Sequence, residues 1–480
     1  MRRRAARAAL VALLLAGAAC HDSNRPAASP ASSSTAPSSA PPATPVATTA
    51  PATTTSSPLR LIDGCPDPGP LAEPDPQRPT YRAAVAVDPP LSSVSGSVEV
   101  RFVPDLGIDE LVFRLWPNAP VPAAAGAHLE VSSVADTQSR AALATAQPDP
   151  TTLRVALGRT VEAGASVTVT LTFALTVPGN SNDRIAHAGD TMRLGSFLPL
   201  LAWEPGTGWA IEPATAIHGE AATSPVADYD VGITVPDGYD VLGTGERGPD
   251  GHWRATAVRD VAFSIGHFDI AEQEVAGVHV TVGVDRSVGE DPHHELALIA
   301  TALPNYQARV GAYPWSTYTV AMTPGFRGGI EFPLHVMQGP GSQDRSVVHE
   351  LAHQWFYSLV GNDQARDPWL DESLASYLEF VQIGSLARHG HDAVPAAVRG
   401  HAGDPMTFWE HHSSDYYTGV YVQGAVAIAS LGTTDEVDCA LRQYVAHEAF
   451  RIATPADLFA ALSTVFPDPV AALAPAGLRP

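Results

Sequence analysis

The spacing of apolar residues changes once along this chain, and the change divides the sequence into two parts. From about Thr80 to Ile270 apolar and polar residues alternate, as Val98, Val100 and Phe102 do with the polar residues between them. Successive side chains of a strand point to opposite faces, so this pattern predicts strands with one buried face. The clearest alternating runs are residues 98–102, 167–173 and 229–235. Separated by Gly, Pro and Asp, they predict an all-β domain.

After about Asp291 the apolar spacing becomes helical. Helices are expected over residues 294–310, 342–360, 368–384 and 419–431, and two more strands over 278–284 and 318–322. We therefore predict an α+β multidomain fold, with a β domain over 75–272 and a mixed α/β, mainly helical domain over 273–475. A chain of 480 residues, 45% of them hydrophobic, is long enough to bury two such cores.

The first 20 residues predict an export signal. Basic residues at 2–4 and 7 precede a short apolar run over 8–15, and small residues then lead to Cys20. A Cys in this place resembles a bacterial lipoprotein signal, in which the Cys is diacylated and becomes the new N-terminus. Cleavage near Ala18 by an ordinary signal peptidase is the alternative. Either way we expect an exported protein, secreted or attached peripherally to the cell surface through lipid on Cys20.

Residues 21–58 predict a disordered linker, because nearly all of them from Ser23 onward are Ser, Thr, Pro or Ala. Such a segment buries too little apolar surface to offset its ordering entropy. Beyond it, Cys65 and Cys439 could form one disulfide in an oxidising compartment. The chain has no Cys-x-x-Cys spacing, which argues against a thiolate zinc site.

The formal net charge of -23 argues against nucleic acid and anionic membrane surfaces as partners. Charged residues make up only 16% of the chain, so the excess of acid is diffuse and predicts solubility. We expect a monomer.

The segment His349-Glu350-Leu351-Ala352-His353 has the spacing of a helical zinc site. Residues four apart on an α-helix lie about 40° apart around the axis, so both imidazoles point the same way. Glu350 then lies beside the metal, where a general base for the attacking water belongs. Glu372, 19 residues after His353, is the candidate for the third ligand. One zinc ion per chain is therefore predicted.

This segment resembles the gluzincin metallopeptidases, and specifically the aminopeptidase N family. That family typically has Trp-Leu-Asn-Glu-Gly around its third ligand, where this chain has Trp-Leu-Asp-Glu-Ser, so that Asp371 and Ser373 depart from the pattern. The resemblance implies a saddle-like N-terminal β domain and a thermolysin-like catalytic domain. Since the sequence ends at Pro480, it also implies a short, two-domain member without the family's large helical-repeat domain.

Upstream, Gly328-Gly329-Ile330-Glu331-Phe332 is similar to the family's Gly-x-Met-Glu-Asn motif. The resemblance implies that Glu331, with Gly328 and Gly329 beside it, binds the protonated α-amine of the substrate. Phe332 in place of Asn departs from the motif. The alternative is a Gly-rich turn before Pro333, with Glu331 merely solvated.

Downstream, Tyr421-Val422-Gln423-Gly424-Ala425 resembles the family's Tyr-x-Lys-Gly-Ala, which implies that Tyr421 donates a hydrogen bond to the oxyanion. Tyr416 and Tyr417 compete for this role. Glu379 lies two helical turns after the third ligand, on the same face, and matches a carboxylate that the family places behind a ligand histidine. A solvated Glu379 is the alternative.

These residues predict a zinc-dependent enzyme that hydrolyses peptide bonds and removes amino acids from the N-terminus of peptides. A zinc endopeptidase or oligopeptidase is one alternative. A surface lipoprotein that binds peptides without cutting them is another, although such a protein has no use for a base at Glu350.

Overall fold

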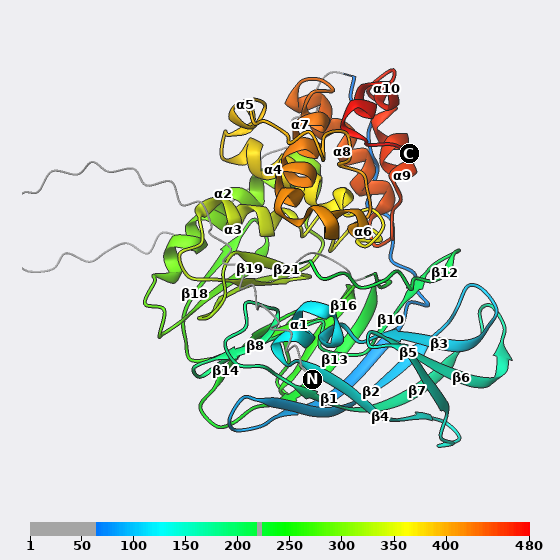
Figure 1. Ribbon diagram of the computed structural model, residues 1–480. Helices are drawn as coiled ribbons and strands as arrows, with labels where there is room; N and C mark the ends of the chain where they lie inside the picture. Colours follow the sequence, from blue (N-terminus) through cyan, green and yellow to red (C-terminus); the bar gives the residue numbers. More distant parts are fainter. Residues whose placement is uncertain (1–63, 218–222) are drawn as a thin grey trace, which may run out of the picture. The chain divides into compact units, whose positions relative to one another are not determined.

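The computed structural model describes residues 64–217 and 223–480 of the chain (Figure 1). The predicted export signal and most of the predicted linker lie outside these residues. Among the residues described, no helix is both long enough and apolar enough to span a bilayer.

The first half of the described chain forms several sheets that share one apolar core, which we call the β domain. Its largest sheet has the strand order β15-β16-β13-β1-β2-β7-β4. In that order the strands are Glu246–Arg247, His252–Val258, Ala227–Thr234, Thr80–Val87, Ser93–Phe102, Val167–Thr176 and His128–Asp136. The runs 98–102 and 167–173 lie in β2 and β7, and their apolar residues are buried, as expected for strands with one covered face. The run 229–235 begins in β13 and passes its end by one residue; Tyr229 and Val231 are buried, whereas Ile233 and Val235 are partly buried.

Two four-stranded sheets complete this core. One has the order β10-β3-β6-β5, made of Leu200–Leu201, Ile108–Arg114, Thr152–Val161 and Ala144–Asp149. The other has the order β14-β17-β9-β8, made of Asp240–Gly243, Ala262–Gly266, Thr191–Gly195 and Ile185–Ala188. The hairpin β11 (Trp203–Glu204) and β12 (Gly208–Trp209) and the short helix α1 (Pro120–Ala125) are additions. The predicted β-rich N-terminal half is confirmed.

The second half, which we call the helical domain, begins with a five-stranded sheet of order β18-β19-β20-β22-β21. These strands are Phe268–Val275, Val278–Asp285, Thr317–Met322, His335–Gln338 and Gly329–Phe332. The edge strand β21 is antiparallel to β22, whereas β20 is parallel to both of its neighbours. The predicted boundary at 272/273 falls inside β18, whose pairing with β19 assigns the whole hairpin to this sheet.

The helices pack with this sheet around a second core that contains Trp355, Trp369 and Tyr306. They lie together in Figure 1, apart from the strands of the β domain. The longer ones are α2 (Pro292–Val310), α3 (Asp344–Ala352), α4 (Trp369–Gln382), α7 (Gln423–Ala429), α8 (Thr434–Glu448) and α9 (Pro455–Leu462). The shorter ones are α5 (Leu386–His389), α6 (Met406–Trp409) and α10 (Pro469–Leu473), and a π-helical turn, η3 (Tyr417–Val422), runs directly into α7.

One helix is shorter than predicted. The sequence predicts a helix over 342–360, but α3 ends at Ala352 and the chain then turns, with a φ of 123° at Tyr357. The Arg259 side chain of the β domain holds this turn, because its Nε donates to the Tyr357 carbonyl at 2.8 Å. Trp355 and Leu359 stay fully buried in the same core, so the apolar spacing continues past the end of the helix. Periodicity therefore could not reveal where α3 stops.

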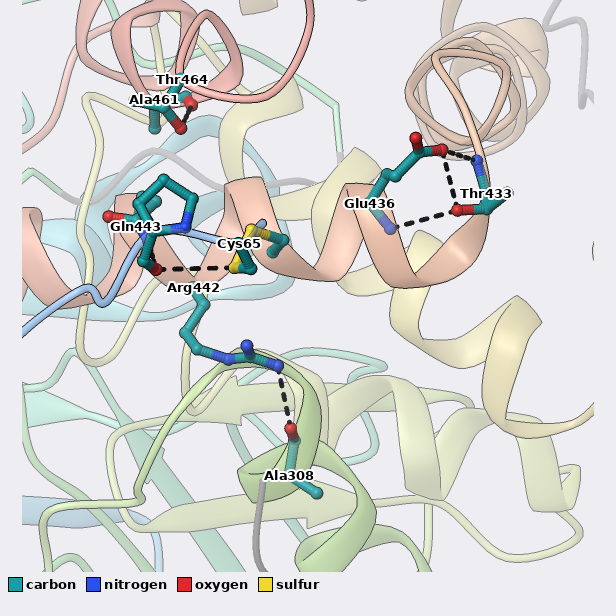
Figure 2. The surroundings of a disulfide bond; sticks show 10 residues. Cys65, Ala308, Thr433, Glu436, Arg442, Gln443, Ala461 and Thr464 are labelled. Carbon is teal, nitrogen blue, oxygen red and sulfur yellow. Dashed lines mark hydrogen bonds between the residues drawn. A yellow bond between two sulfur atoms is a disulfide. The ribbon is translucent and has the colours of Figure 1, made fainter. Parts of the chain in front are cut away.

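A disulfide joins Cys65 to Cys439 on α8 (Figure 2). Beside it, Gln443 Nε2 donates to the Pro66 carbonyl at 2.7 Å, and the Ala72 amide donates to the Ala446 carbonyl at 2.8 Å. The segment before β1 thus lies along the helical domain before it enters the β domain. The pairing that the sequence left open is present.

Candidate metal centre

Two packed helices bring the predicted metal ligands together. His349 and His353 lie one turn apart at the end of α3, and Glu372 lies in the first turn of α4. Both helices bury apolar faces in the same core, which fixes their relative position. His349, His353 and Glu372 are 7%, 1% and 1% exposed, so the site is shielded from bulk water.

The ligand atoms converge. The two Nε2 atoms are 3.1 Å apart, and Glu372 Oε2 lies 3.2 Å from that of His349 and 3.4 Å from that of His353. Ligand atoms held about 2.0–2.1 Å from a tetrahedral Zn²⁺ are roughly 3.3 Å apart, so the spacing fits the ion. Two imidazoles and a carboxylate are also a donor set that Zn²⁺ takes in catalytic sites. These residues therefore fit one zinc ion.

The other ring nitrogens of the two histidines have partners that fix each ring. His349 Nδ1 lies 3.1 Å from Glu379 Oε2, and His353 Nδ1 lies 3.0 Å from the Phe356 carbonyl oxygen. Because each Nδ1 has a partner on the far side of its ring, each Nε2 faces the position between the three ligand atoms where the zinc ion would bind. Glu379 is 2% exposed, so the structure places it behind His349 and not in solvent.

The charges of the cluster favour a cation. Burial raises the pKa of a carboxyl, but the two imidazoles outweigh it and hold the pKa of Glu372 well below its usual range. Burial lowers the pKa of His349, but its hydrogen bonds to Glu372 and Glu379 outweigh burial and raise that pKa to about 9. At neutral pH Glu372 is therefore a carboxylate beside protonated imidazoles, and a metal ion that binds there would displace the imidazole protons.

Glu350 and Glu331 also lie close to His353. Their carboxylates and His353 form a second group whose candidate ligand atoms all lie within 4.8 Å of one another. Burial raises the pKa of Glu350 to about 7, which suits a general base at neutral pH. A Cβ on Gly329 would lie 2.4 Å from the Glu350 side chain, so only glycine allows β21 to approach the base this closely.

Of the three candidate tyrosines, the structure brings Tyr421 to the metal ligands. Its hydroxyl donates to Glu372 Oε1, and its ring stacks on His349 with the centroids 5.6 Å apart. The Tyr417 hydroxyl instead accepts from Arg345 Nη1 at 2.5 Å, and Tyr416 packs against Trp409. Tyr421 lies in the π-helical turn η3, a type of local geometry that recurs at functional sites.

The departures from the family motifs have structural explanations. The Ser373 hydroxyl donates to the Val420 carbonyl of η3 at 2.9 Å, and a Cβ on Gly424 would lie 2.0 Å from that hydroxyl oxygen. Asp371 accepts from Gln364 Nε2 at 2.8 Å. Gln423 makes hydrogen bonds with three backbone groups, on Gly400, Val398 and Gly419. These residues hold α4 and η3 in place, and the Gln423 amide is fully engaged in doing so.

Sequence reasoning missed two residues that contact the site. Arg345 Nη1 lies 3.2 Å from Glu379 Oε1, and its position one turn before His349 was a signal that helical phase offered. Gln354 is fully buried and bonds the backbone on both sides of Pro333. No local sequence pattern indicates this role of Gln354.

Comparison with known proteins agrees with this geometry. Residues 341–475 match the model of the peptidase family M1 domain. Aminopeptidase N of Lactobacillus helveticus is 31% identical over 136 residues, which are 25% of this chain and 16% of that protein. Leucine aminopeptidase 2 of Aspergillus fumigatus is 30% identical over 136 residues, 26% of this chain and 22% of that protein. The matches therefore span less than a quarter of the length of either protein.

The fold of this chain matches that of a solved structure over most of the chain. An M1 zinc metallopeptidase from Deinococcus radiodurans superposes with a TM-score of 0.58 at 18% identity, covering 83% of this chain and 93% of that chain. The predicted two-domain fold, with a β-rich domain before a mainly helical domain, is thereby confirmed.

Proposed function

We propose that this chain, which carries a peptidase family M1 domain over residues 341–475, is a zinc-dependent aminopeptidase that releases amino acids one at a time from peptides. The observation that carries the proposal is the buried convergence of His349, His353 and Glu372, with Glu350 and Glu331 beside them. The similarity to aminopeptidases supports the same conclusion.

Each side chain of the site has a chemical role in this reaction. His349, His353 and Glu372 would hold a Zn²⁺ ion, which would supply a Lewis acid for the water and the scissile carbonyl. Glu350 takes a proton from the attacking water and passes it to the departing amine. The Tyr421 hydroxyl turns from Glu372 to the carbonyl oxygen as negative charge develops there.

Glu331 sets the direction of cleavage. Glu331 is 7% exposed and lies on the edge strand β21, with Glu350 and His353 close by. A carboxylate in this place is both acceptor and countercharge for an α-ammonium group. An extended peptide can pair with the free edge of β21 while its N-terminus meets Glu331. The scissile bond then lies one residue from the amine.

We also propose that the protein is exported and tethered through lipid on Cys20, and that it acts as a monomer. The Cys65–Cys439 disulfide supports export, since such bonds persist in oxidising compartments. Mass spectrometry of the mature N-terminus tests the tether. A diacylated Cys20 is expected, whereas an unmodified terminus at another residue would remove the anchor and leave export in place.

Glu350→Gln should keep about one zinc per chain and lower turnover by roughly a hundredfold to ten-thousandfold, because only the base is removed. Elemental analysis and amino-acid amide hydrolysis measure the two effects. Glu295→Gln is the matched control, since burial also raises the pKa of Glu295 to about 7 and this residue stands on α2. If the Glu350 variant hydrolyses amides as fast as the control, Glu350 is not the general base.

Glu331→Gln should lower kcat/KM for free-amine substrates about a hundredfold or more, because a buried ion pair loses a few kcal/mol when one partner is neutralised. Acetylation of the substrate amine should do the same to the native protein. Zinc content should not change. Blocked peptides cut as fast as free ones, with the Glu331 variant indifferent to the amine, would instead identify an endopeptidase.

A further inference from the structure

The turn that follows Glu331 is inserted into the β domain. Leu334 has a φ of 62°, and its side chain is buried in the apolar core of the β domain, although the residue belongs to the β21–β22 hairpin. The Thr244 hydroxyl of the β domain donates to the Pro333 carbonyl at 2.9 Å. Ser264 Oγ lies 3.0 Å from His335 Nε2, also within hydrogen-bonding distance. Three successive residues of the turn are therefore held by the β domain.

The same turn is held from the other side by the metal-binding segment. Gln354, the residue after His353, donates from Nε2 to the Phe332 carbonyl at 3.0 Å. Its Oε1 accepts from the Leu334 amide at 2.8 Å. Gln354 therefore fixes the end of β21 relative to the metal ligands, while the β domain fixes it from outside.

Phe332 completes this contact, and it is the residue that departs from the family motif. Its side chain is 1% exposed and packs in a small apolar cluster with Ala262 of β17 and Met337 of β22. The ring lies against Gly195, the last residue of β9, where an added Cβ would be 2.2 Å from Phe332 Cζ. Gly195 thus leaves the space that the Phe332 ring occupies. The ring is buried between the two domains, adjacent to Glu331 in sequence.

We propose that Phe332 and Gly195 are positioning residues that place Glu331 for the substrate's α-amine, so that the β domain takes part in selecting free N-termini. The proposal rests on the aminopeptidase function proposed above. Phe332 takes no part in binding the amine. It fixes β21 against the β domain, and the neighbouring carboxylate takes its position from that contact. A displacement of about 1 Å at such a site lowers the rate of reaction by as much as about a hundredfold.

Gly195→Ala tests the proposal. The added methyl group overlaps the Phe332 ring and should displace β21, which would raise KM for fluorogenic amino-acid amides about tenfold or more, with a smaller change in kcat. Zinc content should match that of the native protein. The double variant Gly195→Ala/Phe332→Leu removes the overlap and should recover most of the lost affinity. Phe332→Leu alone leaves the contact underpacked and should also raise KM, which provides a second variant if Gly195→Ala folds poorly.

Gly283→Ala is the matched control. A Cβ on Gly283 of β19 would lie 2.3 Å from Cδ1 of Leu242 in the β domain, so it overpacks the same pair of domains away from β21. It should lower the melting temperature without raising KM. Equal KM changes in the Gly195 and Gly283 variants, or no change in either, would overturn the positioning role of Phe332 and Gly195 but not the proposed aminopeptidase function. A native protein that cuts acetylated substrates as fast as free ones would overturn the proposed function, and the inference with it.

Discussion

The burial of one carboxylate, that of Glu372, constrains most of this site. A buried carboxylate is unfavourable unless charged or polar partners compensate its desolvation. Here the partners are two imidazoles and the Tyr421 hydroxyl, and they come from α3 and η3 while Glu372 itself comes from α4. The three segments must therefore pack so that these groups meet. The core around Trp369 supplies the apolar burial that holds them there.

The packing of α4 against η3 follows from this requirement. Ser373 lies so close to Gly424 that there is no room for a Cβ on residue 424. The Ser373 hydroxyl donates a hydrogen bond to a backbone carbonyl of the π-helical turn. Tyr421 is thereby directed at Glu372. Behind the ligands, Arg345 joins Glu379 to Tyr417, so one network supports both a ligand histidine and the turn that carries Tyr421. The three predicted metal ligands and Tyr421 are thus positioned together.

The sequence predicts those features of the site that depend on residues close together in the chain, and it does not predict contacts between residues far apart in the chain. His349, Glu350 and His353 could be assigned because helical spacing alone places them, and Glu372 because a family motif marks it. Three strands of the β domain, β2, β7 and β13, were indicated by alternation. The end of α3 could not be predicted, since Trp355 and Leu359 keep the apolar spacing after the helix stops. The contact of Gly195 with Phe332 joins residues far apart in sequence, and only the folded chain brings them together.

We propose that zinc binds to His349, His353 and Glu372, which leaves Glu350 and Glu331 available for proton transfer and amine binding. An anomalous difference map of the zinc-loaded protein, collected at the zinc absorption edge, tests this directly. One peak is expected, between the two Nε2 atoms and the Glu372 carboxylate. A peak at the overlapping group of Glu331, Glu350 and His353 would contradict it, because an ion there would occupy both the base and the amine anchor.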